Sequence, residues 1–306
     1  MPTSPLPAES PPAPARAHPR SVPRRFVIAM LVLLAGFAWP LFQLFSFSLS
    51  HSFYSHIVII PLVSGYFVWL RRDTLRLSGP AAVLPGAVLL AVGALLLAGY
   101  LTADPKAPIP DRLAWMTSAF VFALAGVSAL TLGRDFLRDA LFPLAFLLFM
   151  IPIPTGVELA IELFLQHGSA AVCAVLFKVS GTPTFQSDLV FQLPGISIRV
   201  APECSGLRST LALMITSVVA AQMFLRSPVR RLVLVALVVP LALVRNGLRI
   251  YTIGQLCVYV GPHMIDSPIH HHGGPVFFAL SLVPFAFVLR WLIKSERRSA
   301  PAAATP

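Results

Sequence analysis

Long apolar runs separated by short polar segments dominate the pattern along this chain. A helix that crosses a bilayer needs about 20 mostly apolar residues. Runs of that kind, with few or no charged residues, occupy 26–46, 53–70, 81–101, 113–132, 207–225, 229–244 and 275–293, and a shorter run occupies 140–153. The pattern therefore predicts an all-α polytopic membrane protein with about eight transmembrane helices.

The segment 156–178 has a different pattern from these runs. Its polar residues Glu158, Glu162 and Gln166 recur every four positions, which places them on one face of a helix. We expect this segment to be a re-entrant or interfacial helix. The run 140–153 is short for a span, so 156–178 can be the segment that crosses the membrane while 140–153 does not. The later loops keep the same sides in either case.

The basic residues predict the orientation in the membrane, because cytoplasmic loops are enriched in Lys and Arg. If 156–178 does not cross, the inner face collects 16 of the 23 basic residues, whereas the split falls to 14 against 9 if it does cross. The first arrangement is preferred. It predicts a multi-pass protein of the cell inner membrane, with a disordered cytoplasmic tail at 1–25, a transmembrane domain at 26–294 and a cytoplasmic C-terminal tail at 295–306.

The longest non-helical segment between the predicted helices is 181–206, which lies on the outer side in this arrangement. Residues 188–193 and 196–200 flank Pro194-Gly195, and apolar and polar residues alternate after this turn. The alternation predicts a short extracytoplasmic β-hairpin.

Composition and charge exclude several classes of protein. A chain with 57% hydrophobic and 11% charged residues is too apolar for a soluble globular domain of this length. Its net charge of +11 is spread in short clusters between the apolar runs, so we expect no nucleic-acid binding. Three cysteines are too few for a disulfide framework or a zinc motif, and no cofactor is expected.

Cys204 is the cysteine with a reactive setting. It lies where the hairpin ends and the span 207–225 begins, so it feels the positive end of the helix dipole, and Arg208 adds a cation. Both effects stabilise a thiolate, which is the nucleophilic form. Cys173 and Cys257 lie inside apolar stretches and are interpreted as small buried hydrophobes.

Two further polar groups reach the same predicted membrane face. Arg249 is expected at the outer end of the span that begins near 229, and Arg245 lies deeper on the same helical face, so one of the two should meet a carboxylate or a developing negative charge. The run His270-His271-His272 precedes the last span. General acid or base chemistry is favoured over metal binding, because adjacent residues rarely supply three ligands of one tetrahedral site.

A set of short motifs spread over residues 50 to 294 resembles the exosortase/archaeosortase family. The motifs are Ser55-His56, Trp69-Leu70-Arg71-Arg72, Phe142-Pro143, Phe149-Met150-Ile151-Pro152-Ile153-Pro154, Glu203-Cys204-Ser205-Gly206-Leu207-Arg208-Ser209, Pro240-Leu241-Ala242, Asn246-Gly247-Leu248-Arg249-Ile250, and a histidine four residues before Gly274. The resemblance implies a catalytic triad of Cys204, Arg249 and His270 at the outer membrane face. His270 fits the family histidine best, although His271 and His272 stand beside it.

The resemblance also implies an activity. The chain would be a thiol protease or transpeptidase that cleaves C-terminal sorting signals, of the Pro-Glu-Pro class, from exported proteins whose own apolar helix lies among the membrane lipids. The alternative is a multi-span transporter or a lipid-binding membrane protein. The peptidase is preferred because the sequence has no inverted repeat and almost no Asp or Glu inside the spans, both of which a transporter would use.

Overall fold

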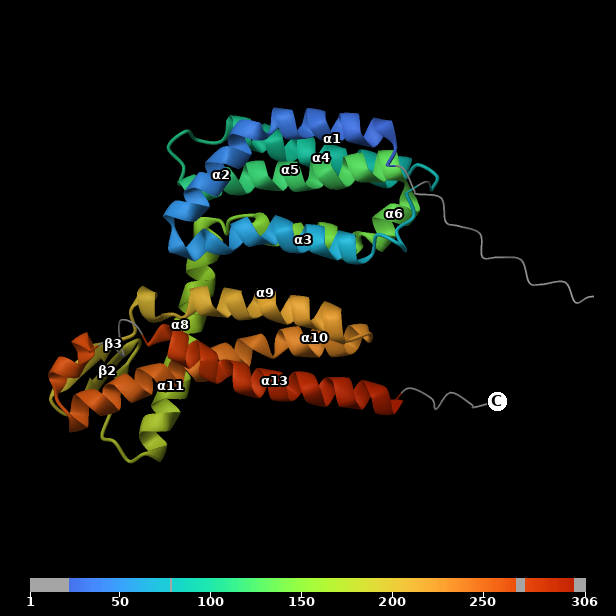
Figure 1. Ribbon diagram of the computed structural model, residues 1–306. Coiled ribbons are helices and arrows are strands. Elements are labelled where there is room, and N and C mark those ends of the chain that lie inside the picture. Colours follow the sequence, from blue (N-terminus) through green and yellow to red (C-terminus); the bar gives the residue numbers. More distant parts are fainter. Residues whose placement is uncertain (1–21, 78, 268–272, 300–306) are drawn as a thin grey trace, which may run out of the picture. The chain divides into compact units, whose positions relative to one another are not determined.

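The computed structural model describes residues 22–77, 79–267 and 273–299 (Figure 1). The chain forms two compact units. The first unit contains the chain up to Ser50 together with 57–107 and 112–151, and the second contains 51–56, 108–111 and the chain from Pro152 onward. Two short pieces of the N-terminal half therefore belong to the second unit.

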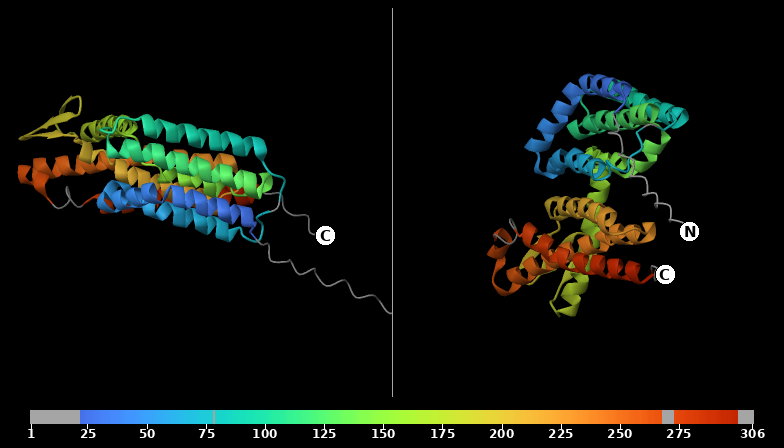
Figure 2. Two further views of the ribbon diagram at one scale, coloured as in Figure 1. Left: turned by 90° about the horizontal axis from the view of Figure 1, so that it is seen from above. Right: turned by 45° about the vertical axis from the view of Figure 1, so that its right-hand side comes forward.

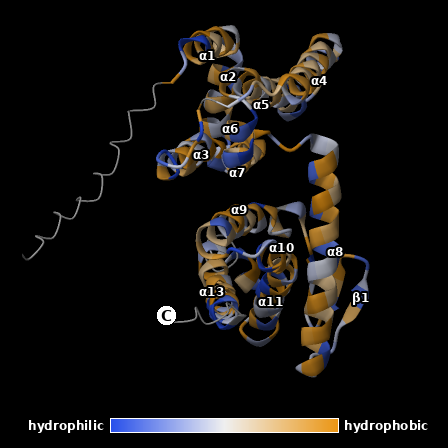
Figure 3. Ribbon diagram, turned by 90° about the vertical axis from the view of Figure 1, so that its right-hand side faces the viewer, coloured by the Kyte–Doolittle hydropathy of each residue, from blue (hydrophilic) through white to orange (hydrophobic). Residues whose placement is uncertain are grey.

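The first unit is a set of helices. Its elements are α1 (Arg24–Gly36), α2 (Ala38–Ser50), the end of the 3-10 helix η1 (Ser52–Val58), α3 (Ile59–Leu70), α4 (Val83–Thr102), most of α5 (Ile109–Leu132), α6 (Arg134–Asp139), α7 (Leu141–Phe146) and the 3-10 helix η2 (Leu147–Met150). Helices α1, α3, α4 and α5 run side by side along one direction (Figures 1 and 2). Apolar residues cover most of their length, as the orange colour in Figure 3 shows.

The first predicted span is bent rather than straight. Helices α1 and α2 meet at an angle of 62°. Pro40 has no N–H to donate to the carbonyl of Gly36, and its ring crowds that carbonyl, so the break falls at Phe37. The expected single helix over 26–46 is thus two helices.

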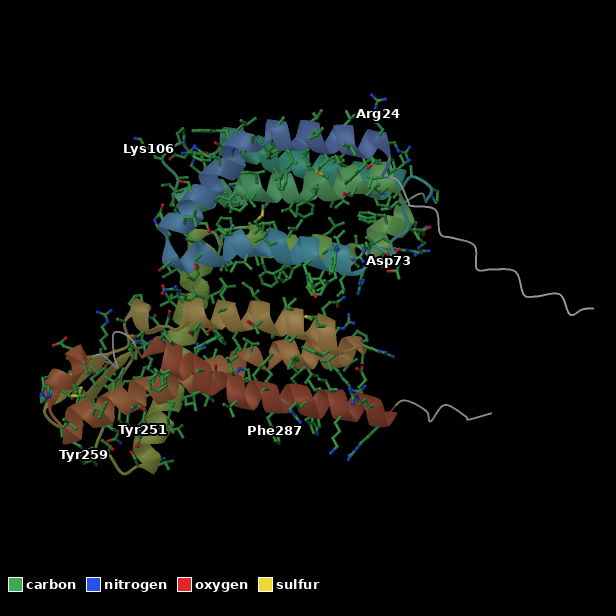
Figure 4. The ribbon with its side chains drawn as sticks, in the orientation of Figure 1. Arg24, Asp73, Lys106, Tyr251, Tyr259 and Phe287 are labelled. Carbon is green, nitrogen blue, oxygen red and sulfur yellow. The ribbon has the colours of Figure 1, made fainter. Side chains whose placement is uncertain are left out.

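Charged side chains connect the loops at one end of the first unit. The Arg76 guanidinium donates to both oxygens of Asp139 at 3.1 and 3.0 Å, and Arg71 donates to the backbone carbonyl of Asp139 at 3.2 Å. The hydrogen bond from Arg76 holds the pKa of the Asp139 carboxyl below its ordinary value. The basic-residue counts place all three residues on the cytoplasmic side. Figure 4 shows Asp73 at this end of the unit and Lys106 at the other.

The second unit combines helices with a small sheet. Its elements are α8 (Thr155–Val179), β1 (Phe185–Ser187), β2 (Val190–Leu193), β3 (Ile196–Arg199), the 3-10 helix η3 (Pro202–Cys204), α9 (Leu207–Phe224), α10 (Pro228–Ala236), α11 (Val238–Tyr259), the 3-10 helix η4 (Pro262–Asp266) and α13 (Gly274–Ser299). Helices α9, α10 and α13 run along one direction, and α8 runs across it (Figures 1 and 3).

The predicted membrane fold is confirmed. Within the described ranges, seven helices are long and apolar enough to cross a membrane, and the bent pair of α1 and α2 makes eight. Helix α8 is one of them by length, at 25 residues, whereas the apolar helix over Leu141–Met150 is shorter than a span. That α8 is re-entrant or lies along the membrane surface stays a prediction, which its course across α9, α10 and α13 favours.

The predicted β-hairpin is present and is extended by one strand. Strands β2 and β3 are antiparallel, with Leu193 opposite Ile196 across the turn, where Gly195 has a φ of 84°. Strand β1 adds to the outer edge of β2, giving the order β1-β2-β3. The inner residues of the sheet, such as Phe191, pack against Phe177 of α8 and the two buried cysteines Cys173 and Cys257.

Candidate functional site

Four structural elements meet at one end of the second unit. The sheet, the beginning of α9, the end of α11 and the beginning of α13 all lie at this end (Figures 1 and 2). A cleft of about 640 Å³ opens at the beginning of α9 and of α13, and η1, α8 and the middle of α11 also contribute to its lining. Its lining comes from residues far apart in the sequence, including Phe53, Glu158, Ser205, Arg249 and Gly274.

Cys204 is the last residue of η3 and lies just before the first turn of α9. Its side chain is partly buried, and its N–H donates to the carbonyl of Ala201 at 2.9 Å. The residues on both sides of it, Pro202 and Ser205, line the cleft. Gly206, the N-cap residue of α9, has a φ of 75°, which turns the chain from η3 into the helix. The structure thus has the predicted cysteine at a helix N-terminus.

Arg208 and Arg249 both line the cleft. Arg208 is an exposed residue in the first turn of α9, as predicted. Arg249 is not at the end of a helix, because α11 continues ten residues further, to Tyr259. Two arginines therefore line the cleft close to the segment that carries Cys204.

The second arginine of α11 has a different place. Arg245 is only 6% exposed, and its Nη2 donates to the carbonyl of Gly206 and to Oγ1 of Thr210, both at 3.3 Å. These bonds give the guanidinium acceptors inside an otherwise apolar segment. Arg245 is bound to the beginning of α9, and Arg249 is the arginine that faces the cleft.

The polar stripe of α8 faces this site. Glu158 and Glu162 line the cleft, and Ser205 donates to Glu162 at 3.3 Å. Glu158 accepts a hydrogen bond of 2.9 Å from the hydroxyl of Tyr54, and Gln166 donates to the carbonyl of Val200 at 3.3 Å. The stripe therefore gives the cleft a wall of carboxylates opposite its arginines and holds the chain that leads from the sheet to Cys204.

The beginning of α8 is held by a residue of the N-terminal half. The Asp111 carboxylate accepts hydrogen bonds from the N–H of Thr155 at 2.6 Å and from its hydroxyl at 2.8 Å. Such an acceptor satisfies one of the free N–H groups at a helix start. Tyr54, Asp111 and Thr155 all lie where the predicted orientation places the outer side of the membrane, and both Tyr54 and Asp111 bind residues of α8.

Asn246 is the residue of this site that the sequence analysis did not assign. It is 2% exposed, and its Nδ2 donates to the carbonyl of Cys204 at 2.6 Å, to the carbonyl of Ser205 at 3.2 Å and to Oγ of Ser169 at 3.1 Å. The signal in the sequence was a polar side chain inside a predicted span, next to Arg245. Placing such a side chain in a membrane costs free energy, so its presence there indicates a functional contact.

The three consecutive histidines, including His270, lie outside the described residues. Gly274, four positions after His270, lines the cleft, as does Pro275. Among the residues that the structure describes, no three His, Cys, Asp or Glu side chains lie together in a way that would hold a metal ion.

The arrangement has the groups that nucleophilic chemistry on a peptide requires. A thiol at a helix N-terminus is stabilised as a thiolate by the helix dipole and by cations nearby. Guanidinium groups in the same cleft can bind a carbonyl oxygen that gains negative charge. Phe53 and Phe278 give the cleft apolar surface on which an extended chain can lie.

Comparison with known proteins agrees with this site. The family model of the transmembrane exosortases (Exosortase_EpsH) matches residues 47–287, which contain every described residue named above as lining the cleft. Neither a curated protein nor a solved structure matches the chain. The family match covers most of the chain, and this multi-pass membrane protein therefore belongs to the transmembrane exosortases, a family that processes protein sorting signals within the membrane.

Proposed function

We propose that this exosortase is a cysteine peptidase or transpeptidase that cleaves C-terminal sorting signals, of the Pro-Glu-Pro type, from exported proteins. The observation that carries the proposal is the shared cleft. The residues flanking Cys204 and Arg249 line one cavity, although they are about 45 positions apart in the sequence. The other two cysteines of the chain are buried in the apolar core beneath the sheet, where Cys173 and Cys257 are 0% and 2% exposed.

The proposed chemistry uses Cys204 and Arg249 together with His270, the histidine that the family resemblance implies. The Cys204 thiolate attacks the carbonyl carbon of the scissile peptide, and Arg249 donates to the oxygen that becomes negatively charged. The C–N bond then breaks, the leaving amine takes a proton from His270, and the acyl group remains on sulfur as a thioester. Water or the amine of an acceptor then attacks the thioester and gives up a proton to His270, and the sulfur leaves as the thiolate from which the cycle began.

The proposed location is the inner membrane, with the cleft facing the periplasm. The distribution of basic residues supports it, because the loops around the cleft contain few of them and the opposite ends contain most. The contacts between loops agree, since Arg76 meets Asp139 on the predicted inner side and Tyr54 meets Glu158 on the predicted outer side. A substrate whose C-terminal helix lies in the bilayer then presents its signal at the depth of the cleft.

Replacement of each cysteine tests the proposal. We expect Cys204→Ala and Cys204→Ser to abolish processing of a host precursor that ends in a short motif, an apolar helix and a basic tail. Cys173→Ala and Cys257→Ala are the matched controls, because both thiols are buried away from the cleft and should leave processing near the unmodified level. Normal processing by Cys204→Ala, at normal protein level, would overturn the proposal.

A trapping experiment tests the intermediate. A thioester between Cys204 and the processed precursor should accumulate in membranes when the acceptor is absent, and neutral hydroxylamine should release it. A covalent adduct that resists hydroxylamine, or one that forms equally in Cys204→Ala, would contradict the mechanism.

A further inference from the structure

The side chain of Asn246 binds the backbone that carries the cysteine. Its Nδ2 lies 2.6 Å from the carbonyl oxygen of Cys204 and 3.2 Å from that of Ser205. Carbonyl oxygens only accept hydrogen bonds, so the nitrogen of this amide must face them and the oxygen must face away. The chemistry of the partners thus fixes the orientation of the amide.

The neighbouring side chain extends the same pattern. Arg245 donates to the carbonyl of Gly206, so the carbonyls of residues 204, 205 and 206 are all bound by Arg245 and Asn246. In a trans peptide the carbonyl and the following N–H point in opposite directions. The N–H groups of residues 205 to 207 are therefore turned away from these two side chains, and Gly206 and Leu207 line the cleft.

Burial makes this binding strong and geometrically specific. Asn246 is 2% exposed and Ser169, its third partner, is 0% exposed. A hydrogen bond in such a setting does not compete with water, and losing the donor leaves buried acceptors without a partner. The turn from η3 into α9 is held in one conformation as a result.

We propose that Asn246 is a positioning residue for the peptidase reaction. It does not touch the substrate. It holds the backbone of Cys204 and Ser205 so that the thiol stands at a fixed distance from Arg249 and from a peptide in the cleft. The inference rests on the proposed function of Cys204, and a displacement of about 1 Å at a reacting group can cost about 100-fold in rate.

The test compares variants of Asn246 with a matched variant of Ser169 in the full chain, reconstituted in liposomes with a precursor reporter. We expect Asn246→Ala to lower kcat by about 10- to 100-fold and to leave KM unchanged, because the positioning is lost and no side chain lining the cleft changes. Ser169→Ala removes only the third partner of Nδ2, keeps both carbonyl bonds, and should retain a kcat near the unmodified value.

A purely structural role gives a different result. Asn246→Ala and Ser169→Ala would then both lower the amount of folded protein, and the folded fraction of each would have the unmodified kcat. That outcome overturns the inference. If Asn246→Ala does not fold, the milder variant Asn246→Ser, which keeps one hydrogen-bond donor, is measured in its place. An intermediate kcat of Asn246→Ser supports the positioning role, and an unchanged kcat contradicts it.

Cys204→Ala in the same assay separates this inference from the proposed function. If Cys204→Ala processes the reporter, the proposed function is wrong whatever the Asn246 variants do. If Cys204→Ala is inactive and folded Asn246→Ala has unmodified kcat and KM, the peptidase stands and only the positioning role is wrong.

Discussion

Gly206→Ala tests whether the close packing of Gly206 against Arg245 and Asn246 positions Cys204. Gly206 has a φ of 75°, and a Cβ added there would lie 3.2 Å from Nη2 of Arg245 and 3.2 Å from Oδ1 of Asn246. Gly195, in the hairpin turn, has a φ of 84° and nothing within 4 Å of an added Cβ. Gly195→Ala therefore meets the same conformational cost without the contacts and is the matched control.

The expected loss of stability follows from the positive φ that both glycines share, and the expected loss of rate follows from the contacts that only Gly206 has. An L-residue in the left-handed region costs about 1–2 kcal/mol, so both variants should be less stable by about that amount. In Gly206→Ala the new methyl group also pushes Arg245 or Asn246 away by a few tenths of an ångström. Because a small misplacement is costly in rate, we expect Gly206→Ala to slow processing by about 10- to 100-fold, and Gly195→Ala to keep the rate of its folded fraction.

The assay is a pulse-chase measurement of precursor processing at equal levels of membrane-inserted protein. Thermal denaturation in detergent gives the stability of both variants. Equal processing rates for folded Gly206→Ala and folded Gly195→Ala would refute the reasoning, because the contacts with Arg245 and Asn246 would then not position the cysteine.

Three further predictions concern the orientation and the other two catalytic candidates. Reporter fusions after Arg231 and after Gly261 should give signals from opposite sides of the membrane, and signals from the same side would contradict the predicted orientation. Arg249→Lys should lower the processing rate by about 100- to 1000-fold, because an ammonium cannot replace a planar guanidinium that donates to an oxyanion. A near-unmodified rate in Arg249→Lys, together with a loss of processing in Arg245→Lys, would identify Arg245 as the catalytic arginine. Single alanine variants across 270–272 should give one dominant loss, at His270, with no effect of a chelator, whereas three equal losses with chelator sensitivity would indicate a metal site.

The sequence alone predicted most of the helices and the sheet, because their patterns are local. Long apolar runs predict spans, and the alternation around Pro194-Gly195 predicts a hairpin that the structure confirms. Strand β1 was not predicted because it has only three residues, all exposed, and no alternation to recognise. The bend between α1 and α2 was also missed, although Pro40 is the local signal for it.

The length of α11 was not predictable from local pattern. Arg245 ends the apolar run 229–244, and Arg249 was expected at the outer end of the helix, whereas α11 continues to Tyr259. The guanidinium is tolerated because Gly206 and Thr210, about 40 positions away in the sequence, accept its hydrogen bonds. Only the folded chain brings these acceptors to it.

The candidate site was predictable as a set of residue types and only partly as an arrangement. Motifs pointed to Cys204 and Arg249, and the four-residue period of Glu158 and Glu162 predicted a polar face without saying what it faces. The structure shows that this face belongs to the same cleft. Asn246 makes contacts across long separations in the sequence, which no local pattern encodes.

The residues that line the cleft come from early, middle and late parts of the chain, so the cleft is completed in stages during synthesis. Phe53 is made early, Glu158 and Ser205 come later, and Gly274 and Phe278 of α13 come last. Because a chain emerges from the ribosome from its N-terminus, the thiol enters the membrane well before the final wall of its cleft exists. A nascent or prematurely terminated chain that lacks α13 therefore carries the cysteine without the complete cleft, and the peptidase activity proposed above requires α13 to have been made.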